Sequence, residues 1–200
     1  MPITFSTENN RKGKIILNTR HDLLRKIPKN TIGIEIGVHN GDNALDITNI
    51  IKPKKLYLID AWPDYVFDFK NLKRGKKIAE ESYNKVISKF KNFSNVEIRR
   101  EFSVEAANNF PDDFFDWIYI DASHRYEEIK RDLDAWYPKL KSKGVFCGDD
   151  YIDKKGGAAY DFGVVQAVNE FLDDKNLILE YTTNKNDPKH PSPQWAIIKP

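Results

Sequence analysis

The sequence predicts an α/β fold, a three-layer sandwich around a Rossmann-like, mostly parallel seven-stranded sheet with a C-terminal antiparallel hairpin. Short apolar segments alternate with segments of helical apolar spacing from residue 31 to residue 183. Two of the apolar segments run directly into carboxylates, as strands do when they feed a site at a sheet edge. Two further apolar segments end the sequence with no helix between them, which indicates the hairpin.

The first elements follow from simple patterns. Residues 1–20 are polar and weakly patterned, so we expect an arm, and residues 23–27 predict a short helix that Pro28 ends. Residues 31–37 (TIGIEIG) place Ile at alternate positions, which is typical of a buried strand. Residues 39–51 return to helical spacing.

The middle of the sequence continues this alternation. The expected strands are 55–62, 95–102 and 114–121, and the expected helices are 76–91, 103–110 and 125–140. Ser103 is the expected N-cap of its helix. The helix over 125–140 has one apolar face, and we expect its acids, Asp132 among them, on the exposed face.

The last elements complete the sheet. Residues 144–149 predict a strand, and the glycine-rich loop over 156–163 is expected to cover an acceptor substrate. Residues 164–172 predict a helix, and the segments 176–183 and 194–200 are the strands of the hairpin.

Length and composition indicate one domain over residues 31–200, preceded by an arm and short helix over residues 1–30. The net charge of +2 gives no reason to expect a nucleic-acid partner. The single cysteine, Cys147, excludes internal disulfides and a metal cluster of cysteines alone. Because no leader and no membrane-spanning apolar segment are visible, we expect a cytoplasmic protein without a membrane partner.

The turn after the first strand, Glu35 to Gly41, indicates a ligand site. Gly37 and Gly41 allow the backbone to turn tightly and to approach a ligand. The turn lacks the G-x-G-x-x-G pattern of dinucleotide sites, and Glu35 would repel a pyrophosphate but attract an ammonium or a ribose hydroxyl. We therefore expect a nucleoside with a cationic tail, bound by Glu35, Gly37, His39, Asn40 and Gly41. A turn without a ligand is the alternative.

Three polar or aromatic residues after the next strands extend this site. Asp60 ends the second strand, where a carboxylate can accept hydrogen bonds from ribose hydroxyls. Trp62 either stacks on a base or packs in the core. Ser103 either donates a hydrogen bond to the ligand or caps its helix.

Carboxylates gather after the fourth and fifth strands, in the segments YIDASH and GDDY. Asp121, Asp149 and Asp150 should meet above the sheet edge, where close carboxylates repel one another unless a cation lies between them. Oxygen ligands suit Mg²⁺ or a similar divalent ion. His124 is the natural proton acceptor, since histidine serves this role near neutral pH. The alternative is that the acids cap helices and His124 is a polar cap residue.

These segments together resemble the class I S-adenosylmethionine-dependent methyltransferases. The resemblance covers about residues 30–200 and rests on EIGVHNGDNA, LYLIDAW, the Asp-x-x-His and Gly-Asp-Asp-Tyr segments and the terminal WAIIKP. It is closest in kind to the branch of macrocin O-methyltransferase-like and cephalosporin hydroxylase-like proteins, many of which methylate sugar or natural-product hydroxyls.

The resemblance implies roles for individual residues. It implies that the turn at Gly37 holds the methionine part of the cofactor, that Asp60 binds the ribose and that Ser103 lies near the adenine. Asp121 is expected to contact both cofactor and metal. Related sugar methyltransferases carry Asp-x-Asp, whereas this sequence has Asp121-Ala122-Ser123 and then His124. Whether Asp121 or His124 is the base therefore stays open.

The sequence thus predicts an O-methyltransferase that uses S-adenosylmethionine and Mg²⁺ on a small hydroxylated acceptor, most readily a sugar. Metal coordination would lower the pKa of the acceptor hydroxyl, and a base would take its proton. Two other classes stay open: a nicotinamide-dependent oxidoreductase, and a non-catalytic nucleoside-binding protein of the same fold. A homodimer in which residues 1–20 complete a neighbouring site also stays open.

Overall fold

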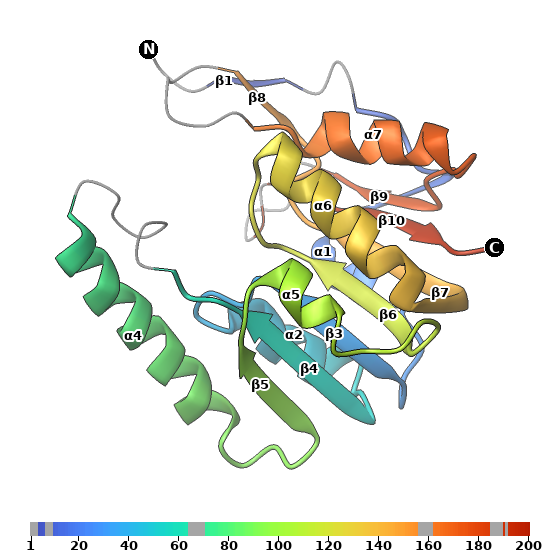
Figure 1. The fold of residues 1–200 in the computed structure, drawn as a ribbon. Coiled ribbons are helices and arrows are strands. Elements are labelled where there is room, and N and C mark those ends of the chain that lie inside the picture. The colour runs from blue at the N-terminus through green and yellow to red at the C-terminus, as the bar shows by residue number, and fades with distance from the viewer. Residues whose placement is uncertain (1–3, 7–9, 64–70, 156–161, 185–189, 191) are drawn as a thin grey trace.

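The computed structural model confirms the predicted α/β sandwich (Figure 1). It describes residues 4–6, 10–63, 71–155, 162–184, 190 and 192–200. Eight strands form the main sheet in the order β2-β9-β10-β7-β6-β3-β4-β5. These strands are β2 (Ile15–Leu17), β3 (Ile32–Ile36), β4 (Lys55–Asp60), β5 (Val96–Arg100), β6 (Phe115–Ile120), β7 (Leu140–Gly148), β9 (Tyr181–Thr183) and β10 (Trp195–Ile198). Only β10 runs antiparallel to its neighbours in this sheet.

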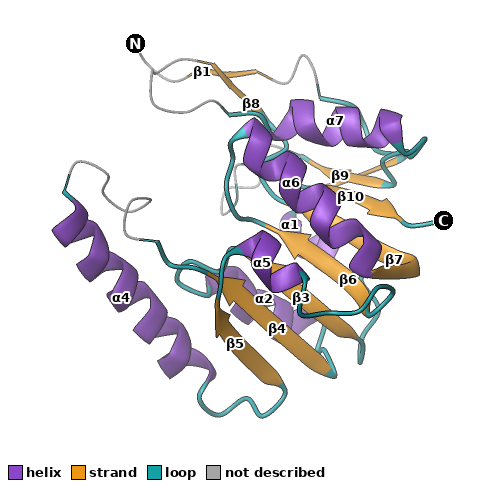
Figure 2. Cartoon of the chain, in the orientation of Figure 1, coloured by secondary structure: helices purple, strands orange, loops and turns teal. Residues whose placement is uncertain are grey.

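Helices cover both faces of the sheet (Figure 2). Apolar residues of α1 (Arg20–Leu24), α2 (Asp42–Ile50) and α4 (Leu72–Phe90) share one core cluster with one face of the strands. The opposite face packs against α5 (Ser103–Ala107), α6 (Tyr126–Trp136) and α7 (Val164–Asp174). A short 3₁₀ helix, η1 (Tyr137–Lys139), joins α6 to β7. None of the described helices is long and apolar enough to cross a membrane.

The central strand β3 shows how the sequence produces these two cores. Ile34 and Ile36 point into the core beneath α5, α6 and α7, while Glu35 points to the opposite face, because successive side chains of a strand alternate. Gly33 pairs with Trp117 of β6, and a Cβ atom at position 33 would overlap the Trp117 ring. Glycine at this position therefore allows the indole to lie across the neighbouring strand.

Three strands were not expected from the sequence, and two of them lie in the arm. Residues Ile15–Leu17 of the arm form β2, which extends the sheet by pairing in parallel with β9. A separate pair joins β1 (Thr4–Ser6) to β8 (Asp153–Lys155). The expected loop over 156–163 lies mostly outside the described residues, since 156–161 are not among them.

The hairpin strand β9 is shorter than expected because the chain first completes the end of α7. Asn176 adopts a left-handed backbone with φ of 52°, and the Leu177 N–H donates to the Leu172 carbonyl at 2.7 Å. This bond closes the helix in the manner of a left-handed C-cap. The strand therefore begins only at Tyr181.

The strand order places a switch point beside β3. The chain leaves β3 toward β4 and β5, and then returns to β6 on the other side of β3. Ligands of open parallel sheets bind above the carboxyl ends of the strands at such a point. The predicted site residues all follow the carboxyl ends of β3, β4, β5, β6 and β7 or lie at the last residues of these strands.

Candidate functional site

The glycine turn follows β3 and leads into α2. Gly37 has φ of 85° and Gly41 has φ of 73°, both in the left-handed region that favours glycine. A Cβ atom at Gly37 would overlap the backbone carbonyl of Asp121, so the turn lies directly against the end of β6. His39 and Asn40 form the outer part of the turn, where the His39 side chain contacts the Asn40 amide.

Asp60 binds the glycine turn through its side chain. Its Oδ2 accepts hydrogen bonds from the N–H groups of Val38 and His39, each at 2.9 Å, and its Oδ1 accepts from the Trp62 N–H at 2.7 Å. The predicted ribose-binding carboxylate therefore lies at the turn, where it shapes the backbone around the expected nucleoside.

Trp62 lies in the core. Its side chain is 1% exposed, its Nε1–H donates to the His39 carbonyl at 2.8 Å, and its ring lies 4.9 Å from the ring of Tyr83 on α4. Of the two roles expected for Trp62, the structure shows packing. The indole therefore packs between α4 and the glycine turn.

Glu35 is a buried carboxyl group beneath the turn. Its Oε1 accepts from Asn43 Nδ2 at 2.9 Å, and its Oε2 has no hydrogen-bond partner among the described residues. Burial raises the pKa of Glu35 to about 8, an effect that Asn43 and Arg20 oppose and that Asp60 and Asp46 reinforce. The group is therefore mostly protonated at neutral pH and would ionise readily next to a bound cation.

Ser103 is the first residue of α5, and the prediction that it is the N-cap was wrong. The N-cap is Phe102, which makes no side-chain cap bond. Ser103 Oγ instead donates to Asp132 Oδ1 at 2.5 Å and accepts from Trp136 Nε1 at 2.9 Å. The expectation for Asp132 was also wrong, because its side chain is 4% exposed and turned toward α5. This buried polar contact joins α5 to α6, and periodicity alone does not reveal it.

The structure brings Asp121, His124 and Asp150 together. Their ligand atoms lie within 4.8 Å of one another, and His124 Nε2 lies 2.8 Å from Asp150 Oδ2. The His124 ring stacks on Phe162, with ring centroids 4.9 Å apart. Burial, together with Asp149, Asp150 and Glu35, raises the pKa of Asp121 well above its ordinary value. Concentrated negative charge of this kind favours a proton or a cation at the cluster.

Asp149 lies beside this cluster and helps to raise the pKa of Asp121, but it is not one of the three grouped residues. Its Oδ2 forms an ion pair with Arg20 Nη1 at 3.1 Å, and its Oδ1 accepts from Gln194 Nε2 and from the Asp150 N–H, each at 2.7 Å. Burial and Asp150 raise its pKa, while Gln194 and Arg20 act in the opposite direction. Of the three acids expected to gather, Asp121 and Asp150 lie in one group with His124, and Asp149 lies beside them with its oxygens bound to protein donors.

Arg20 is the main site residue that the sequence did not reveal. Its side chain is 8% exposed and comes from α1, 129 positions before Asp149. No local pattern marks Arg20, because it is the last residue of the segment interpreted as an arm. Tyr119 of β6 could have been found, since it lies two residues before Asp121 and pairs with Glu35 of the neighbouring strand β3.

Comparison with known proteins agrees with this fold. A family model described as a methyltransferase domain matches residues 34–151, which is more than half of the chain. The chain belongs to this methyltransferase family. The matched region of the methyltransferase runs from the glycine-turn strand to the residue after Asp150 and so contains the whole acid cluster. No curated protein matches the sequence.

Solved structures share the fold at low sequence identity. A Streptococcus mutans protein assigned as a methyltransferase, solved in complex with SAH, has 16% identity and a TM-score of 0.61, with 90% of this chain and 95% of that chain covered. A Clostridium thermocellum protein assigned as an rRNA methylase has 16% identity and a TM-score of 0.63, covering 93% and 100%. Fibrillarin of Aeropyrum pernix, with natively bound S-adenosyl-L-methionine, has 12% identity and a TM-score of 0.62, covering 88% and 72%.

Proposed function

We propose that this methyltransferase transfers a methyl group from S-adenosylmethionine to a hydroxyl of a small acceptor, most readily a sugar. The observation that carries the proposal is the convergence of Asp121, His124 and Asp150 beside the glycine turn, where Gly37 touches the Asp121 backbone. This arrangement sets a nucleoside-binding turn next to groups that can activate a hydroxyl. The resemblance to the macrocin O-methyltransferase-like branch supports the sugar.

The glycine turn is the proposed cofactor site. Gly37 and Gly41 give it close backbone approach, Asp60 lies at its edge and Glu35 lies beneath it. The protonated Glu35 carboxyl would ionise when the cofactor's ammonium approaches, which would strengthen binding of a cationic tail. Structures of the same fold with bound SAH and S-adenosyl-L-methionine support this assignment.

The acid cluster fits a hard divalent cation such as Mg²⁺. Asp121 and Asp150 offer oxygen ligands, and burial followed by the neighbouring acids raises the pKa of Asp121, so a cation would offset the cost of its ionised form. A bound ion would lower the pKa of the acceptor hydroxyl. Asp149, part of the ligand set expected from the sequence, is left out of the proposed set because Arg20 and Gln194 already bind it.

His124 is the proposed proton acceptor. Asp150 Oδ2 lies 2.8 Å from its Nε2 at ion-pair distance, and the Phe162 ring stacks on the imidazole. A carboxylate at this distance would stabilise the imidazolium that forms when the proton is taken. His124 would then remove the hydroxyl proton as the methyl group is transferred in line.

Calorimetric titration with S-adenosylmethionine and with NAD tests the cofactor. We expect binding of the first and none of the second, and the opposite result would favour the oxidoreductase reading, which the family match already disfavours. Turnover is then measured by transfer of labelled methyl groups to a panel of free and glycosidic sugars, with Mg²⁺ or with EDTA. Loss of turnover in EDTA is the expected result.

Variants separate catalysis from mere cofactor binding. Asp121→Asn and His124→Gln should abolish methyl transfer while S-adenosylmethionine still binds. Asp134→Asn, on the exposed face of α6, is the matched control and should leave turnover unchanged. If the wild type binds cofactor but methylates no hydroxyl, the proposal fails and a non-catalytic nucleoside-binding protein is favoured instead.

A further inference from the structure

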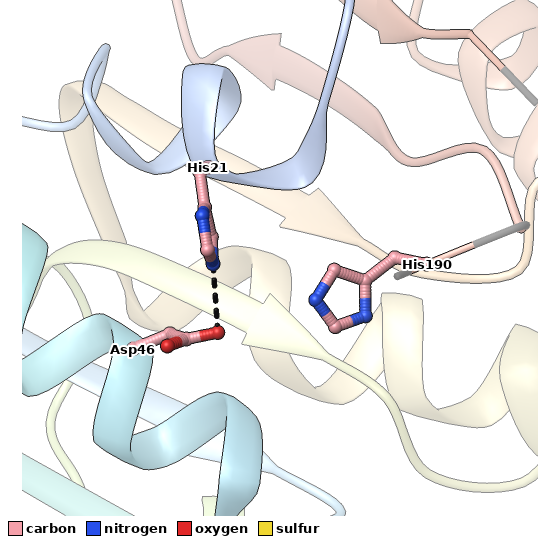
Figure 3. A group of neighbouring side chains, drawn as sticks. All are labelled: His21, Asp46 and His190. Atoms are coloured by element: carbon pink, nitrogen blue, oxygen red, sulfur yellow. Dashed lines mark hydrogen bonds and ion pairs between the residues drawn. The ribbon is translucent and has the colours of Figure 1, made fainter. Parts of the chain in front are cut away.

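A second group of possible metal ligands lies outside the acid cluster. His21, Asp46 and His190 have ligand atoms that all lie within 4.8 Å of one another. His21 Nε2 lies 2.8 Å from Asp46 Oδ2, and the His190 ring faces this pair from the side (Figure 3). The ring centroids of the two histidines are 5.9 Å apart. Three donors from distant parts of the sequence therefore surround one small volume.

Two of the three ligands lie on helices that capping and core packing fix in place. His21 lies on α1, whose start is fixed by a capping box between Thr19 and Asp22. Asp46 lies on α2, and α1 and α2 contribute to one apolar core. The His21 and Asp46 side chains are 29% and 33% exposed, so an ion from solvent can reach them. His190 follows β9 and completes the group.

We propose that His21, Asp46 and His190 bind a borderline divalent cation such as Zn²⁺ or Co²⁺. Two imidazoles and one carboxylate suit these ions better than Mg²⁺, which prefers oxygen ligands. Three protein ligands also leave a coordination position for water or for an added ligand. The ion would connect α1, α2 and the segment before β10, three parts that approach one another on this side of the sheet.

Arg20 competes with a metal ion for His190 at this site. Its Nη2 contacts both ring nitrogens of His190, at 2.9 Å from Nε2. A guanidinium only donates hydrogen bonds, and a neutral imidazole has one lone pair, so Arg20 and a metal ion compete for His190. Metal binding therefore requires Arg20 to release His190 while it keeps its ion pair with Asp149. The site is thereby linked to the residue beside the acid cluster.

The test uses Co²⁺, whose visible spectrum reports coordination by nitrogen ligands, with calorimetry to give stoichiometry. The background carries Asp121→Asn and His124→Gln, which removes the acid cluster as a competing site. In this background we expect one bound Co²⁺ per chain. Adding His21→Gln or His190→Gln should weaken binding by at least about tenfold, as loss of a ligand requires.

The chain has four histidines, so a matched control is at hand. His39→Gln in the same background should leave Co²⁺ affinity unchanged, because His39 lies in the glycine turn. Arg20→Gln should tighten Co²⁺ binding, since it removes both the competing donor and a nearby positive charge. Absence of Co²⁺ binding in the background protein, or binding that His21→Gln and His190→Gln leave unchanged, would overturn the proposal. Melting curves without metal confirm that each variant is folded.

Discussion

Replacing Glu35 by Gln should stabilise the protein at neutral pH. The Glu35 side chain is 1% exposed, and burial raises its pKa from 4.5 to about 8. The folded state thus binds the proton more tightly than the unfolded chain does. The stability that this group contributes is fully present below about pH 4.5 and is lost as pH rises toward 8.

The size of the effect follows from this interval. Each pH unit between the two pKa values lowers the free energy of unfolding by about 1.4 kcal/mol. At pH 7 the buried carboxyl therefore makes the protein about 3 kcal/mol less stable than it is in acid. Gln at position 35 has nearly the same volume and keeps the oxygen that accepts from Asn43. It carries no charge whose burial must be offset, so this cost should disappear.

Urea unfolding of wild type and Glu35→Gln at pH 5, 6, 7 and 8 measures the difference directly. The variant's advantage in free energy of unfolding should grow from below about 1 kcal/mol at pH 5 to about 3 kcal/mol at pH 7. Glu81→Gln, an exposed position on α4, controls for loss of a carboxylate in general. A difference between Glu35→Gln and wild type that does not change with pH would refute the reasoning.

Three further substitutions test the packing of the site. Arg20→Met should lower the free energy of unfolding by about 3 kcal/mol, because Asp149 then lacks its counter-charge. Adding Asp149→Asn should restore most of this stability in denaturant titration. Equal stability of the single and double variants would contradict this. Gly37→Ala should abolish S-adenosylmethionine binding in calorimetry and lower the melting temperature. The added Cβ would overlap the Asp121 carbonyl, and residue 37 has a left-handed φ of 85°. Retained binding would contradict the proposed role of the turn. Ser103→Ala should cost about 1–2 kcal/mol in chemical unfolding, because Asp132 loses a buried donor; an unchanged midpoint would show that the contact is dispensable.

Most of the sheet could be predicted because its signals are local. The alternating Ile residues of β3 and the glycines after it report strand and turn within a short segment, and β3 runs over residues 32–36, inside the expected range of 31–37. The edge strand β2 could not be predicted in the same way. It has three residues, two of them exposed Ile, and it forms only through pairing with β9. Short edge strands depend on such distant partners.

The candidate site was predictable in its acids and less so in its partners. Asp121 and Asp150 follow strands that are adjacent in the sheet, so their proximity follows from topology. The separation of Asp149 from Asp150 depends on Arg20 and Gln194, which lie far away in sequence. Only the fold assigns each acid its partner.

The contact between Gly37 and the Asp121 carbonyl has a consequence for how the enzyme meets its substrates. A 2.7 Å hydrogen bond from the Asp121 N–H to the Ile36 carbonyl also connects the end of β6 to the glycine turn. In the proposed function, the donor and acceptor sites therefore share one stretch of main chain and cannot move apart independently. Much of the entropy of aligning two reactants is settled during folding, before either of them arrives.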